Sequence, residues 1–182
     1  MQSDQVRNII LVGFMASGKS SVARAISRRC HWARIDADEE IVARARKPIS
    51  EIFKDSGEYA FRTLEREVVS DICSETGRII APGGGSFMDE ENRRVMLECG
   101  TVFYLSAQPE TIHWRITRGN PNAPVRPLLG AGNPLARIKE LLAERAPVYS
   151  QAHHKVETDG LTSDQVAQAI LEICGPGIRQ YI

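Results

Sequence analysis

The chain has 182 residues, of which 42% are hydrophobic and 25% are charged, a composition typical of a single globular domain. Its 23 basic side chains balance 23 acidic ones. Nucleic acids and anionic membranes favour a basic surface, so this balance argues against both as main partners. We therefore expect one domain over residues 1–182 that acts on small molecules.

The cysteines and the N-terminal region indicate a cytoplasmic protein. No targeting signal is recognisable, and the apolar run Ile9–Val12 is too short to span a bilayer. The four cysteines are widely spaced, form no zinc-binding pattern, and are interpreted as reduced thiols that mostly fill the core. They are Cys30, Cys73, Cys99 and Cys174.

The first predicted element is a buried strand, Ile9–Val12, which leads directly into a glycine-rich loop. The segment Gly13–Ser20 has the spacing G-x-x-x-x-G-K-S, and a helical pattern follows it. Such a loop points several backbone N–H groups at one anion, and the helix adds the positive end of its dipole. The loop is therefore predicted to hold the polyphosphate of a nucleotide; the alternative is a glycine-rich turn with a chance lysine.

Two side chains of this loop have specific expected roles. Lys19 would place its ammonium group between the β- and γ-phosphates, and the Ser20 hydroxyl would ligate Mg²⁺. The nucleotide-binding candidates are Gly13, Ala16, Ser17, Gly18, Lys19, Ser20 and Ser21.

An acidic segment follows the next, weaker strand, predicted over Trp32–Ile35. Phosphoryl transfer needs one carboxylate to help hold Mg²⁺ and another to orient or deprotonate the accepting hydroxyl. Asp36 and Asp38 could supply them. Acidic residues in the first turn of a helix also complement its dipole, so both interpretations stay open.

A helix with one apolar stripe is predicted next, and Arg62 lies on its polar side. Glu58 and Glu65 could pair with this arginine as a surface ion network, so a binding role is not required by the pattern. The stripe consists of Phe61, Leu64, Val68 and Ile72.

Three consecutive glycines, Gly83–Gly85, follow the short predicted strand Arg78–Ala81. Their exposed backbone lets a flat or anionic ligand approach closely, and a plain tight turn rarely needs all three. In parallel sheets the ligand crevice lies beyond the carboxyl ends of the strands. We therefore expect Gly13–Ser20, Asp36–Asp38 and Gly83–Gly85 to converge on one edge.

A strong strand, Thr101–Leu105, precedes a segment rich in Gly, Pro and Asn between residues 119 and 132. This segment carries Arg126 and is predicted to be a lid that excludes water from phosphoryl transfer; the alternative is a passive surface loop. The helix after it opens with Asn133-Pro134 and ends near Arg145, which alone could simply neutralise the helix C-terminus. Arginine binds carboxylates bidentately, so Arg62, Arg145 and the three glycines together suggest a carboxylate pocket.

The last predicted elements are a weak strand, His154–Val156, and a helix that opens with a capping box at Thr162–Gln165. Adjacent residues of a strand face opposite ways, so we interpret His153 and His154 as structural. Strands and helices alternate along the chain, which predicts an α/β fold with a parallel sheet covered on both faces.

Taken together, these segments resemble shikimate kinases from about residue 8 to residue 173. The resemblance implies a three-layer P-loop kinase fold, like that of nucleoside monophosphate kinases, with a five-stranded parallel sheet. It places the P-loop at residues 13–20, a substrate-binding helical region at about 37–65 and a lid at about 119–133. The matching segments are Gly-Phe-Met-Ala-Ser-Gly-Lys-Ser, Asp-Ala-Asp, Ile-Phe-Lys-Asp-Ser-Gly-Glu-Tyr-Ala-Phe-Arg, Gly-Gly-Gly, Val-Arg-Pro-Leu-Leu and Glu-Arg-Ala-Pro-Val-Tyr.

The resemblance also implies an activity: transfer of the ATP γ-phosphoryl group to the 3-hydroxyl of shikimate, with Mg²⁺, on the route to chorismate and the aromatic amino acids. We expect a monomer with small-molecule substrates. By position, Asp36 would hold Mg²⁺ through water, and Arg118 would lie by the adenine. The implied catalytic set is Lys19, Asp38 and Arg126; the implied shikimate-binding set is Asp38, Arg62, Gly83, Gly84, Gly85 and Arg145.

The chain departs from the family pattern at Ala16, in the lid, which carries extra Asn-Pro residues, and in the tail 175–182, and two alternative functions stay open. Ala16 stands where the family usually has a glycine, so its methyl group could restrict the P-loop. A kinase for another sugar acid, such as gluconate, would share the P-loop without requiring Arg62, the glycine run and Arg145 together. A non-catalytic ligand-sensing module would be expected to have lost Lys19, one aspartate of the pair or the lid arginine.

Overall fold

The computed structural model describes residues 6–118, 133–175 and 178. Five strands form one parallel sheet in the order β2-β3-β1-β4-β5. All five predicted strands are confirmed, with ends that agree to within one residue. Their bounds are β1 (Asn8–Val12), β2 (Ala33–Asp36), β3 (Arg78–Ala81), β4 (Thr101–Ser106) and β5 (His154–Glu157).

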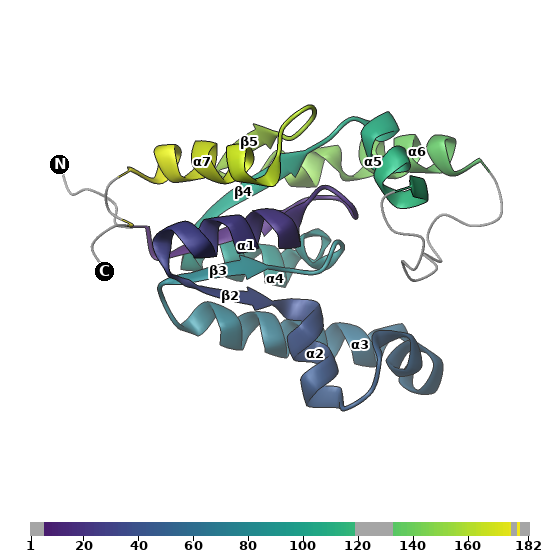
Figure 1. The fold of residues 1–182 in the computed structure, drawn as a ribbon. Coiled ribbons are helices and arrows are strands. Elements are labelled where there is room, and N and C mark those ends of the chain that lie inside the picture. Colours follow the sequence, from purple (N-terminus) through teal and green to yellow (C-terminus); the bar gives the residue numbers. More distant parts are fainter. Residues whose placement is uncertain (1–5, 119–132, 176–177, 179–182) are drawn as a thin grey trace.

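Helices cover both faces of this sheet, which gives three layers and confirms the predicted fold class (Figure 1). None of the helices within the described residues combines the length and apolarity that a bilayer crossing requires. The helices are α1 (Lys19–Cys30), α2 (Ala37–Ala45), α3 (Ile49–Ser74), α4 (Glu90–Cys99), α5 (Pro109–Arg118), α6 (Pro134–Tyr149) and α7 (Ser163–Cys174).

The central strand β1 divides the core in two. All five of its residues are buried, as expected for a parallel strand covered on both sides. Leu11 faces α1 and α7, where it joins a cluster with Ile26 and Ile170. Ile10 faces the opposite layer and joins a cluster that includes Val68 of α3. Since β1 is held on both faces, the loop that follows it has a rigid base.

Local sequence signals fix the helix starts around the candidate site. The Asp36 side chain accepts a hydrogen bond from the Asp38 amide and caps α2. Asn133 caps α6, with Pro134 as the first helical residue, and Thr162 forms the predicted capping box with Gln165 on α7. The caps predicted at Asn133 and Thr162 are thereby confirmed.

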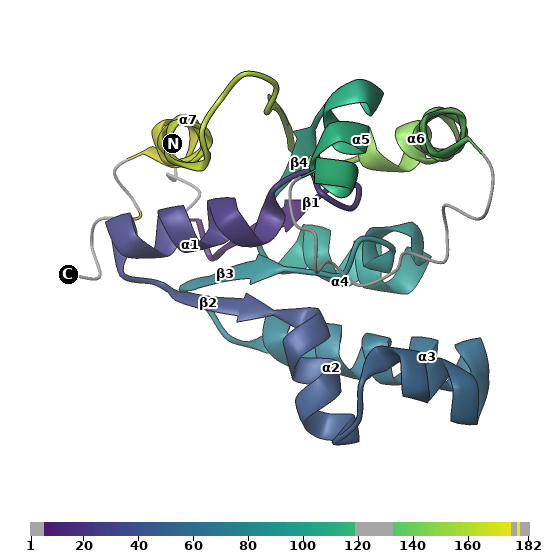
Figure 2. The same ribbon diagram turned by 45° about the vertical axis from the view of Figure 1, so that its right-hand side comes forward.

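Helix α3 is broken within its length at Gly57, where φ is 76° and ψ is 176°. Glycine adopts this positive φ without steric cost, so it permits the change of direction. Figure 2 shows α2 and the beginning of α3 projecting beyond the edge strand β2. The part of α3 after the break carries Arg62 and returns to pack on the sheet through Val68 and Ile72.

The cysteine prediction agrees with the structure. None of the four cysteines forms a disulfide, and Cys30, Cys73 and Cys99 are buried while Cys174 is half-buried.

The adjacent histidines His153 and His154 both contact β4. His153 Nδ1 accepts a hydrogen bond from the Val102 amide at 2.9 Å, and the His154 ring stacks on Phe103.

Candidate active site

The P-loop connects β1 to α1 and has a backbone that few residues could adopt. Gly13 has a φ of +150°, and a Cβ added there would lie 2.7 Å from the Leu105 carbonyl oxygen. Gly18 has a φ of +103° and precedes the first residue of α1. Ala16 adopts the left-handed region with a φ of 59°, so the methyl group is accommodated in a conformation that usually favours glycine.

Lys19 closes back over this loop. Its Nζ donates hydrogen bonds to the carbonyl oxygens of Gly13 at 2.9 Å and Phe14 at 3.0 Å. The ammonium group therefore sits above the loop backbone, where a polyphosphate cradled by the loop amides would meet it. Ser17 is buried in the same loop, and Ser21 is exposed in the first turn of α1.

Ser20 and Asp36 meet at the ends of two different strands. The Ser20 hydroxyl donates to Asp36 Oδ2 at 3.2 Å, which places a hydroxyl and a carboxylate oxygen side by side. Mg²⁺ prefers such oxygen ligands, so the donor set fits this ion. Asp36 also caps α2 through its side chain, a role at the helix end that is compatible with metal binding.

Asp38 lies in the first turn of α2, close to the glycine run. Its Oδ1 would be 2.7 Å from a Cβ added to Gly83, so the carboxylate rests directly on the glycine backbone. Burial raises the pKa of Asp38; the nearby Asp36 charge raises it further, Lys19 lowers it, and Glu65 raises it. The structure thus brings Asp38 to the sheet edge that was expected from the sequence.

The glycine run joins the nucleotide loop to the arginine-bearing helix. A Cβ added to Gly84 would lie 3.6 Å from the Met15 amide nitrogen and 4.0 Å from Lys19 Nζ. A Cβ added to Gly85 would lie 3.6 Å from a terminal nitrogen of Arg62. The predicted convergence of the three loop segments on one edge is confirmed.

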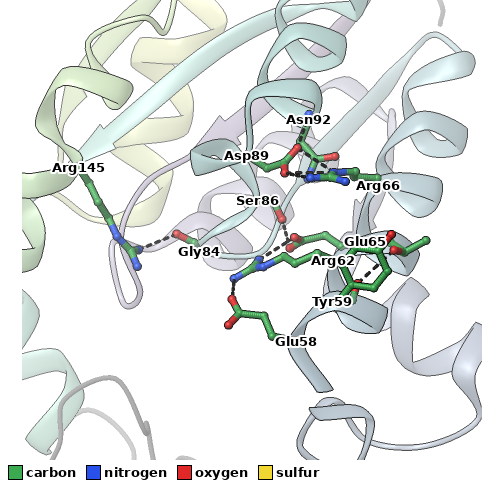
Figure 3. Close-up of polar contacts among 11 residues, drawn as sticks. Glu58, Tyr59, Arg62, Glu65, Arg66, Gly84, Ser86, Asp89, Asn92 and Arg145 are labelled. Carbon is green, nitrogen blue, oxygen red and sulfur yellow. Dashed lines mark hydrogen bonds and ion pairs between the residues drawn. The ribbon is translucent and has the colours of Figure 1, made fainter. Parts of the chain in front are cut away.

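Arg62 lies between two glutamates of its own helix, as Figure 3 shows. Its guanidinium group donates to Glu65 Oε2 at 2.7 Å and to Glu58 Oε1 at 3.3 Å. Burial lowers the pKa of Arg62, but the two glutamates outweigh this effect and the net shift is upward. The predicted ion pairs exist, and the Glu58 pair lies at the surface as expected, but the Glu65 side chain is only 2% exposed, so this half of the network is buried.

Arg145 approaches the glycine run from the other side (Figure 3). It donates to the Gly84 carbonyl oxygen at 3.1 Å, and its guanidinium group lies 5.3 Å from the centre of the Phe14 ring. The Tyr149 hydroxyl also donates to Gly84, at 3.4 Å, and burial raises the pKa of this phenol to about 12. Two guanidinium groups therefore border one short glycine segment.

Comparisons with known proteins agree with this geometry. The shikimate kinase family model matches residues 15–174. The chain is 42% identical over 164 residues to a shikimate kinase of Thermus thermophilus, covering 90% of this chain and 88% of that protein. The chain belongs to the shikimate kinase family.

Two further relatives extend this result. A shikimate kinase of Thermodesulfovibrio yellowstonii is 37% identical over 167 residues, covering 92% of this chain and 94% of that protein. A solved structure of the shikimate kinase from Acinetobacter baumannii in complex with shikimate superposes with a TM-score of 0.84, at 33% identity, covering 93% of each chain.

Three predicted features lie wholly or partly outside what the structure describes. Residues 119–132, which include Arg126, are not among the described residues. Arg118 is the last residue of α5, and only its backbone is described. The lid and the adenine-side arginine therefore remain predictions for this member of the family.

Sequence reasoning missed Arg115, one helical turn before Arg118. Its guanidinium group donates to the carbonyl oxygens of Ala16 at 3.2 Å and Ser17 at 3.3 Å. It also donates to the Thr158 carbonyl oxygen at 3.3 Å, in the loop after β5. Arg115 thereby connects the P-loop to the loop that follows the edge strand β5. The only indication of this residue in the sequence was its position shortly before the predicted lid.

Sequence reasoning also missed how Glu65 is held. Its carboxylate accepts from Arg62 on one oxygen and from the buried Ser86 hydroxyl on the other, at 2.5 Å. Ser86 opens a 3₁₀ turn, Ser86–Met88, directly after the glycine run. A glutamate three residues after an arginine is a common surface pattern, so this buried contact could not be predicted from the sequence.

Proposed function

We propose that the protein transfers the γ-phosphoryl group of ATP to the 3-hydroxyl of shikimate, giving shikimate 3-phosphate. One observation carries the proposal. The glycine run Gly83–Gly85 has Arg62 and Arg145 on two sides, and Asp38 and Lys19 against its backbone. A carboxylate-binding pair, a hydroxyl-facing carboxylate and a phosphate-binding lysine thus belong to one cluster, as a hydroxy-acid kinase requires.

On the donor side, the P-loop amides and Lys19 would hold the ATP phosphates. The bonds of Lys19 Nζ to two loop carbonyl oxygens give it a fixed direction before the nucleotide binds. Ser20 and Asp36 would hold Mg²⁺, Asp36 through water, and the ion would neutralise charge on the β- and γ-phosphates. Gly13, Ala16, Ser17, Gly18 and Ser21 complete the proposed nucleotide-binding set.

On the acceptor side, Arg62 and Arg145 would bind the shikimate carboxylate and so orient the ring against the glycine run. This orientation would present the 3-hydroxyl to Asp38. Asp38 would then accept a hydrogen bond from the hydroxyl and take its proton as the oxygen bonds to the γ-phosphorus, while the bond from that phosphorus to the bridging oxygen breaks and ADP leaves. The raised pKa of Asp38 favours proton acceptance, because it makes the carboxylate a stronger base than an ordinary aspartate.

The sequence supports further elements of this proposal. Arg126, carried by the lid at about residues 119–133, would stabilise charge on the transferring phosphoryl group, and Arg118 would lie by the adenine. We propose a monomeric cytoplasmic enzyme whose partners are these small molecules. The balanced charge of the chain supports the absence of nucleic acid and membrane partners from this proposal.

The two alternative functions have less support. A sugar-acid kinase for a substrate such as gluconate is disfavoured because the family and the reported relatives are shikimate kinases. A ligand-sensing module is disfavoured because Lys19, Asp38 and both acceptor-side arginines are present and assembled.

The deciding experiment is an ADP-release assay with Mg²⁺, ATP and a panel of acceptors that includes shikimate and gluconate. We expect ADP formation to depend on shikimate and not on gluconate. Stimulation by gluconate alone would establish the alternative kinase. Tight shikimate binding without ADP or shikimate 3-phosphate would establish the sensing module.

A further inference from the structure

We propose that Ser86 is a positioning residue of the acceptor site, which directs Arg62 toward its ligand by fixing the carboxylate of Glu65. The inference rests on the proposed function, because it assigns Ser86 to the acceptor half of that same site. It is carried by a continuous chain of contacts that starts in the 3₁₀ turn after the glycine run and ends at the Arg62 guanidinium group.

The first link is a short hydrogen bond between two buried groups. The Ser86 hydroxyl donates to Glu65 Oε1 at 2.5 Å, and the exposed fractions are 0% for Ser86 and 2% for Glu65. Figure 3 shows the two side chains pointing at each other from the turn and from α3. Since neither group can turn to solvent, this hydrogen bond restricts both side chains.

The second link transmits this constraint to the arginine. The other oxygen of Glu65, Oε2, accepts from Arg62 at 2.7 Å. A carboxylate held at both oxygens has a fixed plane, so the direction in which it holds a guanidinium group is fixed as well. With Oε1 unpartnered, the carboxylate would be free to rotate, and Arg62 would keep its charge but lose its orientation.

The third link connects Ser86 to the reacting end of the site. The Ser86 amide donates to the Gly83 carbonyl oxygen at 3.1 Å, and a Cβ added to Gly83 would lie 3.3 Å from Ser86 Oγ. Asp38 Oδ1 lies 2.7 Å from that same Cβ position. Ser86 therefore holds the turn that separates the hydroxyl-facing Asp38 from the carboxylate-binding Arg62.

The experiment compares Ser86→Ala with the unmodified enzyme in steady-state kinetics. We expect Ser86→Ala to raise KM for shikimate about tenfold, the size expected for losing a hydrogen bond to a charged group. KM for ATP should stay within about twofold, since the hydrogen bonds that Ser86 donates run to Glu65 and Gly83 and not to the P-loop. Ser86→Thr keeps a hydroxyl and should recover most of the loss in shikimate KM.

Two further variants separate positioning from general structure. Ser27→Ala is the matched control, because the Ser27 hydroxyl donates to the Trp32 carbonyl oxygen at 2.7 Å at the far end of α1. It should lower the melting temperature and leave both KM values unchanged. In an Arg62→Ala background, Ser86→Ala should change kcat/KM for shikimate by no more than about twofold, because its effect passes through the missing arginine.

Several outcomes would overturn the inference. Ser86 would not act through Arg62 if Ser86→Ala raised both KM values equally or left the KM for shikimate unchanged. Full additivity of the effects of Ser86→Ala and Arg62→Ala on kcat/KM would show the same. Should Ser86→Ala not fold, Ser86→Cys can replace it, because cysteine has nearly the same size and is a weaker donor. Ser86→Cys should raise KM for shikimate by a smaller factor and leave KM for ATP nearly unchanged. A wild-type enzyme that ignores shikimate would reject the proposed function, which is a result distinct from these.

Discussion

The carboxylate of Asp38 and the backbone of Gly83 are packed so closely that a side chain on the glycine would occupy the position of the carboxylate. The distance from Asp38 Oδ1 to a Cβ at Gly83 would be 2.7 Å, whereas a Cβ at Gly85 would meet Arg62 at 3.6 Å, an ordinary contact. Only the first of these two glycines is therefore required by packing.

Replacing Gly83 by alanine is expected to displace Asp38. We expect turnover to fall roughly 100-fold, because a displacement of about 1 Å at a reacting group has an effect of that size. The free energy of unfolding should change little, because the atom in the way is the end of the Asp38 side chain, which can turn aside. Steady-state kinetics and denaturant unfolding of Gly83→Ala and Gly85→Ala check this; an equal loss of turnover in both would contradict the packing argument.

The pH dependence of turnover should reveal the environment of Asp38. The proposed role needs the ionised carboxylate, so turnover should fall on the acid side at a higher pH than an ordinary aspartate would give. The Asp36 charge contributes to the raised pKa, so Asp36→Asn should shift the acid limb to lower pH while also lowering activity.

The shape of the pH–rate profile at saturating Mg²⁺ measures this shift. The matched control is Asp164→Asn, which removes a carboxylate that pairs with Arg28 and Arg29 on the surface of α1. That variant should leave the acid limb in place. A limb that moves equally in both variants would assign the shift to net charge and not to the neighbour of Asp38.

Removing the charge of Asp38 is expected to exchange activity for stability. A carboxyl whose pKa is raised by folding destabilises the folded state when ionised, and this penalty disappears as pH falls below the folded pKa. Asp38→Asn should therefore melt at a higher temperature than the wild type at neutral pH, with the difference vanishing in acid. Turnover should fall by roughly 10²- to 10⁴-fold. Near-wild-type turnover would remove Asp38 from the mechanism.

Arg62 is expected to affect the acceptor far more than the nucleotide. Arg62→Ala should raise KM for shikimate by roughly 10- to 100-fold, the range for losing a bidentate ion pair, while KM for ATP changes little. Arg62→Lys keeps the charge but not the planar fork and should recover only part of the loss. Steady-state kinetics with each substrate provides the measurement. Equal rises in KM for shikimate and for ATP would exclude the assigned role.

Arg115 is expected to affect the nucleotide side. Arg115→Ala removes the hydrogen bonds that hold the carbonyl groups of Ala16 and Ser17, so we expect KM for ATP to rise about tenfold with a smaller change for shikimate. Arg137→Ala, whose arginine pairs with Glu140 on the exposed side of α6, is the matched control and should leave KM for ATP unchanged. A change in KM for shikimate alone would show that Arg115 acts on the acceptor side of the site and not on the nucleotide side.

The sequence predicted the parts of the molecule whose signals are local. The strands, the caps at Asn133 and Thr162, and the P-loop are determined by residues close to one another in the chain. The parallel-sheet rule then placed Asp38 and Gly83–Gly85 together, because carboxyl ends of parallel strands share an edge. This rule is why distant segments could be assigned to one site.

The contacts that the sequence did not predict depend on packing between distant elements. Glu65 looks like a surface ion-pair partner until the turn at Ser86 is placed against it. In the sequence Arg115 looks like an ordinary helix residue. Its role appears only when the loop after β5, which contains Thr158, is placed against it. The break of α3 at Gly57 was also missed, because a single glycine in a helical pattern is often tolerated.

The central place of β1 has a consequence for the order in which the protein forms during synthesis. The P-loop strand leaves the ribosome before its two partners, which are β3, paired as Asn8 with Arg78, and β4, paired as Ile9 with Thr101. The nascent nucleotide loop thus has no sheet to anchor it until both later strands have emerged. Nascent chains that end before β4 should therefore not bind ATP. The ability to bind ATP should appear abruptly once the chain has emerged from the ribosome as far as Ser106.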